Sequence, residues 1–60
     1  MYQKFEKLME EKGLTIYRVA KDTDISTATL YDWKAGRTHP KLDKLQKIAT
    51  YLGVTIGDLI

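Results

Sequence analysis

Apolar residues recur at spacings of three and four over most of the chain, which is the period of an amphipathic α-helix. One such stripe predicts a helix over residues 1–12 and consists of Tyr2, Phe5, Leu8 and Met9. Another predicts a helix whose first turn contains Pro40, and its stripe consists of Leu42, Leu45, Ile48, Ala49 and Leu52. Glycines at positions 13 and 53 follow the two stripes and suit the ends of both helices.

Two shorter helices, joined by a tight turn, are predicted between these. The first runs from Ile16 to residue 22 or 23, with Thr15 as its N-cap and with Val19 and Ala20 facing inward. Asp24 lies in the turn. We expect it in the left-handed conformation, because Asp tolerates a positive φ better than most residues do.

The second short helix is predicted from residue 27 to about residue 35, with Ser26 as its N-cap and Gly36 at its end. Leu30 and Trp33 are its inward residues. Since successive helical residues are about 100° apart, Ala28 points about 170° away from the inward direction. The outward face of this helix consists of Thr27, Ala28, Tyr31 and Asp32.

The end of the chain predicts one more short helix. Thr55 followed three residues later by Asp58 resembles a capping box with a shorter acid. Since no stretch shows the alternation of a strand, the sequence predicts one all-α domain over residues 1–60, a compact bundle of about five short helices. Leu59 and Ile60 either finish its core or form a small exposed apolar patch, and we favour the patch.

Composition narrows the function classes. The chain has 60 residues, no cysteine and one histidine, which argues against a metal site, a disulfide framework or an enzyme. No cofactor is expected. No apolar run approaches the roughly 20 residues that cross a bilayer, and the N-terminus carries acidic residues where a signal peptide would be apolar. The predicted location is the cytoplasm.

The net charge is only +2, but it is unevenly distributed. Residues 34–47, here called the basic segment, carry five basic residues against one acidic residue, a net charge of +4. A local basic patch suits contact with a polyanion, although it could equally be a solvated face.

The outward face of the helix over residues 27–35 fits the major groove of B-DNA, which is about 12 Å wide and accepts one helix. Thr27 can hydrogen-bond a base edge or touch a thymine methyl group, and Ala28 can touch such a methyl group. Tyr31 can reach a base edge or a phosphate. Asp32 can accept from a cytosine amine, or it can simply pair with Arg18 or a nearby lysine.

These features resemble the helix-turn-helix of the lambda repressor/Cro family, also called the xenobiotic-response-element type. The resemblance covers essentially residues 5–60 and includes the later segment KLDKLQKIATYLGV. Within the motif it is carried by Val19, Ala20, Asp24, Ile25, Leu30, Trp33 and Gly36. It implies that the chain binds specific sequences in double-stranded DNA as a bacterial or phage transcriptional regulator associated with the nucleoid, and we expect a repressor.

Carried over by position, the resemblance places base contacts on Thr27, Ala28, Tyr31 and Asp32. Phosphate contacts are expected from Ile16, Tyr17, Lys34, Arg37, Thr38 and Lys41. Ile16 stands where the family often has Gln, so only its backbone N–H can bind a phosphate. Lys34 stands where the family commonly has Glu and can add phosphate affinity.

The implied partner is an operator with two-fold related half-sites, bound by a weak homodimer whose candidate seam is Leu59 and Ile60. No membrane and no small-molecule ligand is implied. The alternative is a protein-interaction module of the same fold, such as an antitoxin or anti-repressor. The two differ in salt dependence, because phosphate contacts weaken steeply with salt and an apolar interface does not.

Overall fold

Four α-helices and one 3₁₀ turn form the regular structure of residues 2–60, which are the residues that the computed structural model describes. In chain order they are α1 (Tyr2–Lys12), α2 (Ile16–Thr23), α3 (Thr27–Lys34), α4 (Leu42–Leu52) and the 3₁₀ turn η1 (Ile56–Asp58). No strand occurs in this range, so the predicted all-α fold is confirmed. The predicted first helix also included Met1, which lies outside the described residues.

The predicted fifth helix is only the three-residue turn η1, so "about five" helices overstates the number of α-helices by one. The longest helices have 11 residues. Within residues 2–60, none is long and apolar enough to cross a membrane.

Short polar side chains begin both middle helices, as predicted. Thr15 Oγ1 accepts a hydrogen bond from the Arg18 N–H at 3.2 Å, and Ser26 Oγ accepts one from the Thr29 N–H at 3.1 Å. Asp24 ends α2 with a φ of 59°, in the expected left-handed conformation. Because helices of eight residues are marginal on their own, these local interactions help to define where α2 and α3 begin and end.

An aromatic cluster joins α3 to α1. The rings of Phe5 and Trp33 stack with their centroids 5.0 Å apart. Tyr2 meets both of them edge-on, with its centroid 5.7 Å from Phe5 and 5.4 Å from Trp33. Trp33 is only 2% exposed, so its predicted place in the core is confirmed.

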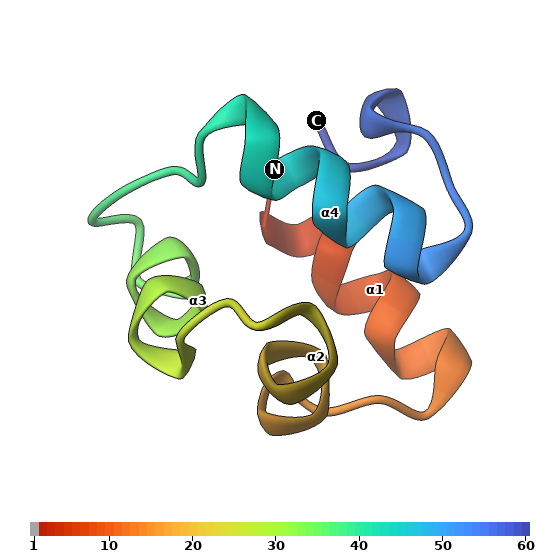
Figure 1. The fold of residues 1–60 in the computed structure, drawn as a ribbon, viewed down its shortest axis with the longest axis horizontal. Helices are drawn as coiled ribbons and strands as arrows, with labels where there is room; N and C mark the ends of the chain where they lie inside the picture. The colour runs from red at the N-terminus through yellow and green to blue at the C-terminus, as the bar shows by residue number, and fades with distance from the viewer. Residues whose placement is uncertain (1) are drawn as a thin grey trace.

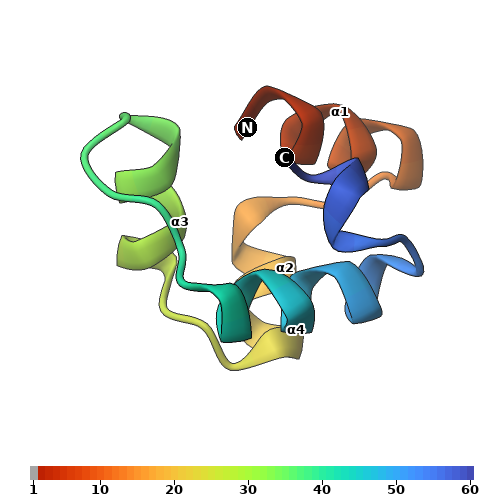
Figure 2. The same cartoon turned by 90° about the horizontal axis from the view of Figure 1, so that it is seen from above.

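The helices are arranged so that α3 lies at one end of the molecule. Both views show this position, and the loop between α3 and α4 extends at the same end (Figure 1, Figure 2). α2 packs against both α3 and α4. The outward side of α3 and the first half of the basic segment therefore belong to one end of the fold.

The start of α4 differs from the prediction in two respects. Lys41 is the N-cap, so Pro40 precedes the helix and is not part of its first turn. Leu42 is 68% exposed, whereas it was predicted to face inward. The buried Pro40 closes the core at this end, and the inward stripe of α4 begins one turn later, at Leu45.

The C-terminal segment folds back onto the core. The Asp58 carboxylate accepts hydrogen bonds from the N–H and from the hydroxyl of Thr55, both at 3.1 Å. Leu59 is completely buried, and Ile60 is 56% exposed. The predicted apolar patch of Leu59 and Ile60 is therefore wrong for Leu59, which fills the core and is not available as a dimer seam.

Candidate nucleic-acid interface

The outward face of α3 is accessible, as its helical geometry predicts. Thr27 and Ala28 are exposed, and Tyr31 is 53% exposed. Asp32 is half-buried at the edge of this face. Opposite them, Leu30 and Trp33 are buried in the core. Thr27, Ala28 and Tyr31 thus form an exposed surface, bordered by Asp32, on a helix whose other side is buried.

The Asp32 carboxylate has a charged partner. Its Oδ1 lies 3.2 Å from Arg37 Nη1, and the two side chains are 42% and 70% exposed. The sequence suggested Arg18 or a lysine as the alternative partner, and this is wrong, because Arg18 pairs with Asp22 on its own helix at 2.8 Å. Two predicted DNA contacts, Asp32 and Arg37, are therefore connected to each other.

The expected phosphate ligands at the end of α3 and in the loop that follows it are all exposed. Lys34 lies in the last turn of α3, where a positive charge also complements the helix dipole. Arg37, Thr38 and Lys41 follow in the loop and are exposed as well. The loop extends at the same end of the fold as α3 (Figure 1), and Arg37 reaches the outward face through its contact with Asp32.

The N-terminus of α2 offers a different kind of contact. Ile16 is only 8% exposed, so its side chain belongs to the core and only its backbone N–H is available. Tyr17 is 69% exposed, so its phenol is free to reach outward. An open groove of about 520 Å³ adjoins it, lined by Tyr17, Ala20, Lys21, Asp24, Ile25, Ser26 and Thr27. The groove runs from α2 across the turn to the first residue of α3.

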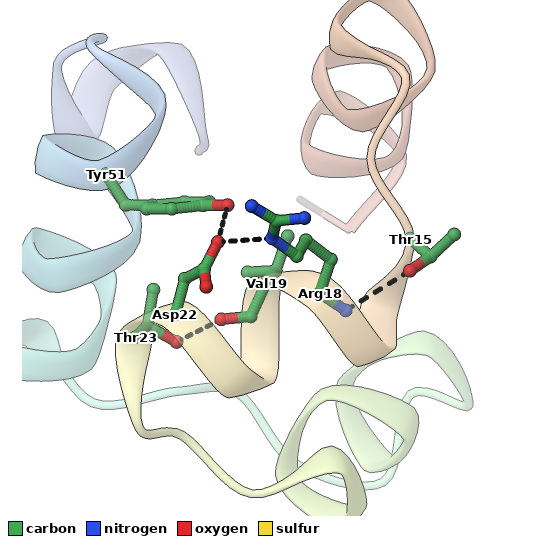
Figure 3. Close-up of polar contacts among 6 residues, drawn as sticks. All are labelled: Thr15, Arg18, Val19, Asp22, Thr23 and Tyr51. Carbon is green, nitrogen blue, oxygen red and sulfur yellow. Dashed lines mark hydrogen bonds and ion pairs between the residues drawn. The ribbon is translucent and has the colours of Figure 1, made fainter.

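A polar cluster that was not predicted connects α2 to α4. Asp22 Oδ2 accepts hydrogen bonds from the Tyr51 hydroxyl at 2.6 Å and from Arg18 Nε at 2.8 Å (Figure 3). These bonds, from Tyr51 first and then from Arg18, lower the pKa of Asp22. The same bonds to Asp22 raise the pKa of Tyr51 and of Arg18. The spacing of Arg18 and Asp22 was visible in the sequence, but Tyr51 is 29 residues away from Asp22 along the chain.

The same end of α2 contains a buried hydroxyl. Thr23 Oγ1 donates a hydrogen bond to the Val19 carbonyl oxygen at 2.6 Å (Figure 3). This bond satisfies a donor that the core would otherwise leave unpaired. The Thr23 bond lies within α2, whereas the Tyr51–Asp22 bond joins α2 to α4.

Comparison with known proteins gives matches over nearly the whole chain. A family model described as a Cro/C1-type HTH DNA-binding domain matches residues 4–60. The chain is 36% identical over 58 residues to the HTH-type transcriptional regulator DdrOP3 of Deinococcus deserti, an alignment that covers 97% of this chain and 45% of that protein. It is 28% identical over 58 residues to the HTH-type transcriptional activator BcrR of Enterococcus faecalis, covering 97% of this chain and 28% of that protein. The chain thus spans less than half the length of these relatives. No solved structure gives a significant match.

Proposed function

Because the chain belongs to the Cro/C1-type helix-turn-helix DNA-binding family, we propose that it is the domain through which a transcriptional regulator binds specific sequences in double-stranded DNA. The observation that carries this proposal is the outward face of α3, which is free of the core and lies at the same end of the fold as the loop of the basic segment. A helix placed in this way can enter the major groove while neighbouring cations bind the phosphates on either side.

In this arrangement the first half of α3 contacts bases through Thr27 and Ala28. Tyr31 and Asp32, one helical turn later, contact further bases. The loop and the end of α3 supply phosphate contacts through Lys34, Arg37, Thr38 and Lys41. α2 crosses the DNA backbone and contributes the N–H group of Ile16 and the phenol of Tyr17. A protein with this function binds the nucleoid in the cytoplasm.

We propose that two copies occupy two half-sites about 34 Å apart, one turn of DNA. Leu59 is buried, so of the two predicted seam residues only Ile60 remains exposed, which makes a weak seam. Pairing is therefore expected on the DNA and not in free solution. Sedimentation of the chain with and without a two-site duplex tests this, and a stable dimer without DNA contradicts it.

The first experiment is selection of bound duplexes from a random DNA library, followed by affinity measurements over a range of salt concentrations. Each phosphate contact contributes about −0.9 to the slope of log K against log salt, so Lys34, Arg37 and Lys41 together predict a slope of about −3 per protomer. Lys41→Ala should reduce this slope, and Lys7→Ala on α1 should not, which makes Lys7 the matched control.

The same measurement separates DNA binding from the rival function, a protein-interaction module. A chain that selects no DNA sequence, or whose DNA affinity is insensitive to salt, refutes the proposal. A reporter promoter carrying the selected site then distinguishes repression, which we expect, from activation, the activity in the name of the Enterococcus faecalis relative.

A further inference from the structure

Gly36 turns the chain after α3 back toward the helix that it has just left. Gly36 has a φ of 76°, in the left-handed region that glycine adopts readily. Its N–H donates to the Trp33 carbonyl oxygen at 3.1 Å, and the Arg37 N–H donates to the Asp32 carbonyl oxygen at 2.9 Å. This pair of bonds is the Schellman pattern of helix ends. It brings the backbone of Arg37 directly to the backbone of Asp32.

The side chains of the same two residues also meet, with Arg37 Nη1 3.2 Å from Asp32 Oδ1. An isolated ion pair on a surface is worth little, because two flexible side chains must be held in one geometry. Here the backbone bond already holds both residues together, which reduces that entropic cost. Arg37 therefore contacts a residue of the outward face twice, once through its backbone and once through its side chain.

A carboxylate close to DNA is repelled by the phosphates. Asp32 must approach a base edge between two strands of phosphates that repel it. A guanidinium at 3.2 Å offsets part of this repulsion and restricts the directions in which the carboxylate can point. A guanidinium has five N–H donors in a fixed fork. Only Nη1 faces Asp32 here, and the other nitrogens can bind a phosphate at the same time.

We propose that Arg37 is a positioning residue for Asp32, and not only a phosphate ligand. It holds the Asp32 carboxylate toward the base edge, so the base preference at that position depends on a residue that contacts no base. This inference rests on the proposed DNA-binding function and assigns the specificity of that site to a pair of residues. The family resemblance places Arg37 among the phosphate contacts, which carry no sequence information directly; the positioning role adds to that contact.

The test compares base preferences, obtained by selection from a random duplex library, for the 60-residue chain and its variants. Asp32→Asn identifies the base pair that Asp32 contacts, where discrimination should fall by roughly 5- to 150-fold. Arg37→Ala should lower discrimination at this same base pair by roughly two- to fivefold, the range of an exposed ion pair, in addition to weakening all binding. Arg37→Lys keeps the charge and should recover part of the preference.

Lys41→Ala is the matched control, because Lys41 is an exposed cation of the same loop with no ion pair to a described residue. It should weaken all sequences alike. In the Asp32→Asn background, Arg37→Ala should no longer change any base preference. Circular dichroism verifies that each variant is folded.

Two results overturn the inference, and they are distinguishable. If the wild-type chain selects a clear consensus, but Arg37→Ala weakens all sequences alike, as Lys41→Ala does, then Arg37 is only a phosphate ligand and this inference alone is wrong. If the wild-type chain selects no consensus, the proposed function is wrong, and the positioning role is wrong with it.

Discussion

Replacing Trp33 with alanine is expected to remove most of the stability of this domain. Trp33 is the largest of the fully buried side chains and is the contact by which α3 packs on α1. Its ring stacks on Phe5 at 5.0 Å and meets Tyr2 edge-on at 5.4 Å. Truncation to alanine therefore opens a cavity beside the rings of Phe5 and Tyr2 and removes the aromatic contact of α3 with α1.

The size of this effect follows from the burial of Trp33. Replacing a buried Trp with Ala typically costs about 3–5 kcal/mol. At about 0.05–0.15 kcal/mol per residue, a chain of 60 residues has a total free energy of unfolding of only about 3–9 kcal/mol. The variant should therefore be partly or largely unfolded at 25 °C.

Trp33→Phe should be much milder. It keeps an aromatic ring against Phe5 and removes the indole N–H, which is buried without a hydrogen-bond partner among residues 2–60. An unpaired buried donor costs about 1–3 kcal/mol, so its removal offsets part of the lost packing. The order of stability is expected to be wild type, then Trp33→Phe, then Trp33→Ala.

Urea unfolding followed by far-ultraviolet circular dichroism measures this order, since the chain has one Trp and the variants lose its fluorescence. Tyr31→Ala is the matched control, because Tyr31 is an aromatic residue of the same helix that is 53% exposed. It should change stability by no more than about 0.5 kcal/mol. A Trp33→Ala variant that loses less than about 1.5 kcal/mol would refute the assignment of Trp33 as the main anchor of α3.

The remaining predictions concern α2 and the chain end. Tyr51→Phe removes the first cause of the lowered pKa of Asp22. A lowered folded-state pKa stabilises the fold above the unfolded pKa, and this contribution is lost as the pH falls through the folded value. Tyr51→Phe should thus be less stable than wild type at pH 7, and the difference in stability should narrow below the ordinary Asp pKa of 3.8. Urea unfolding at several pH values measures this difference. A difference that stays constant with pH would contradict the role of Asp22. Leu59→Ala should lower the free energy of unfolding by about 2–5 kcal/mol, and Ile60→Ala by no more than about 0.5 kcal/mol. If urea unfolding shows an equally small loss for both variants, Leu59 is not part of the core.

Local features of the sequence were sufficient to predict most of the fold. The N-caps Thr15 and Ser26 and the left-handed Asp24 involve interactions within a few residues, which are present in the sequence itself. The inward position of Trp33 followed from its three-residue spacing to Leu30, because this spacing puts both on one face of a helix. The same geometry predicted the exposed outward face.

The errors occur where the partner of a residue is remote or belongs to another element. Leu42 fits the stripe of α4 but is 68% exposed, while Pro40, just before the helix, is buried, and no local pattern in the sequence shows which of the two faces the core. Leu59 and Ile60 are adjacent and both apolar, so only the bend at η1 decides which is buried. Asp22 has charged neighbours at short spacing, yet its shortest contact comes from Tyr51 on α4.

The outward face of α3 consists of two parts that should evolve differently. The Thr27 and Ala28 side chains make no hydrogen bond or ion pair with the described residues, and both residues precede the first inward residue of the helix. Substitutions there should therefore change base preference with little effect on stability. Asp32 is connected through Arg37 to the phosphate-binding loop, and its carbonyl belongs to the motif that ends α3. A change at Asp32 therefore alters base preference and leaves Arg37 without its partner, free to bind phosphate more strongly. Replacing Asp32 with an uncharged residue should consequently raise affinity for unrelated sequences while it lowers discrimination. New specificities should be easier to obtain at residues 27 and 28 than at residue 32.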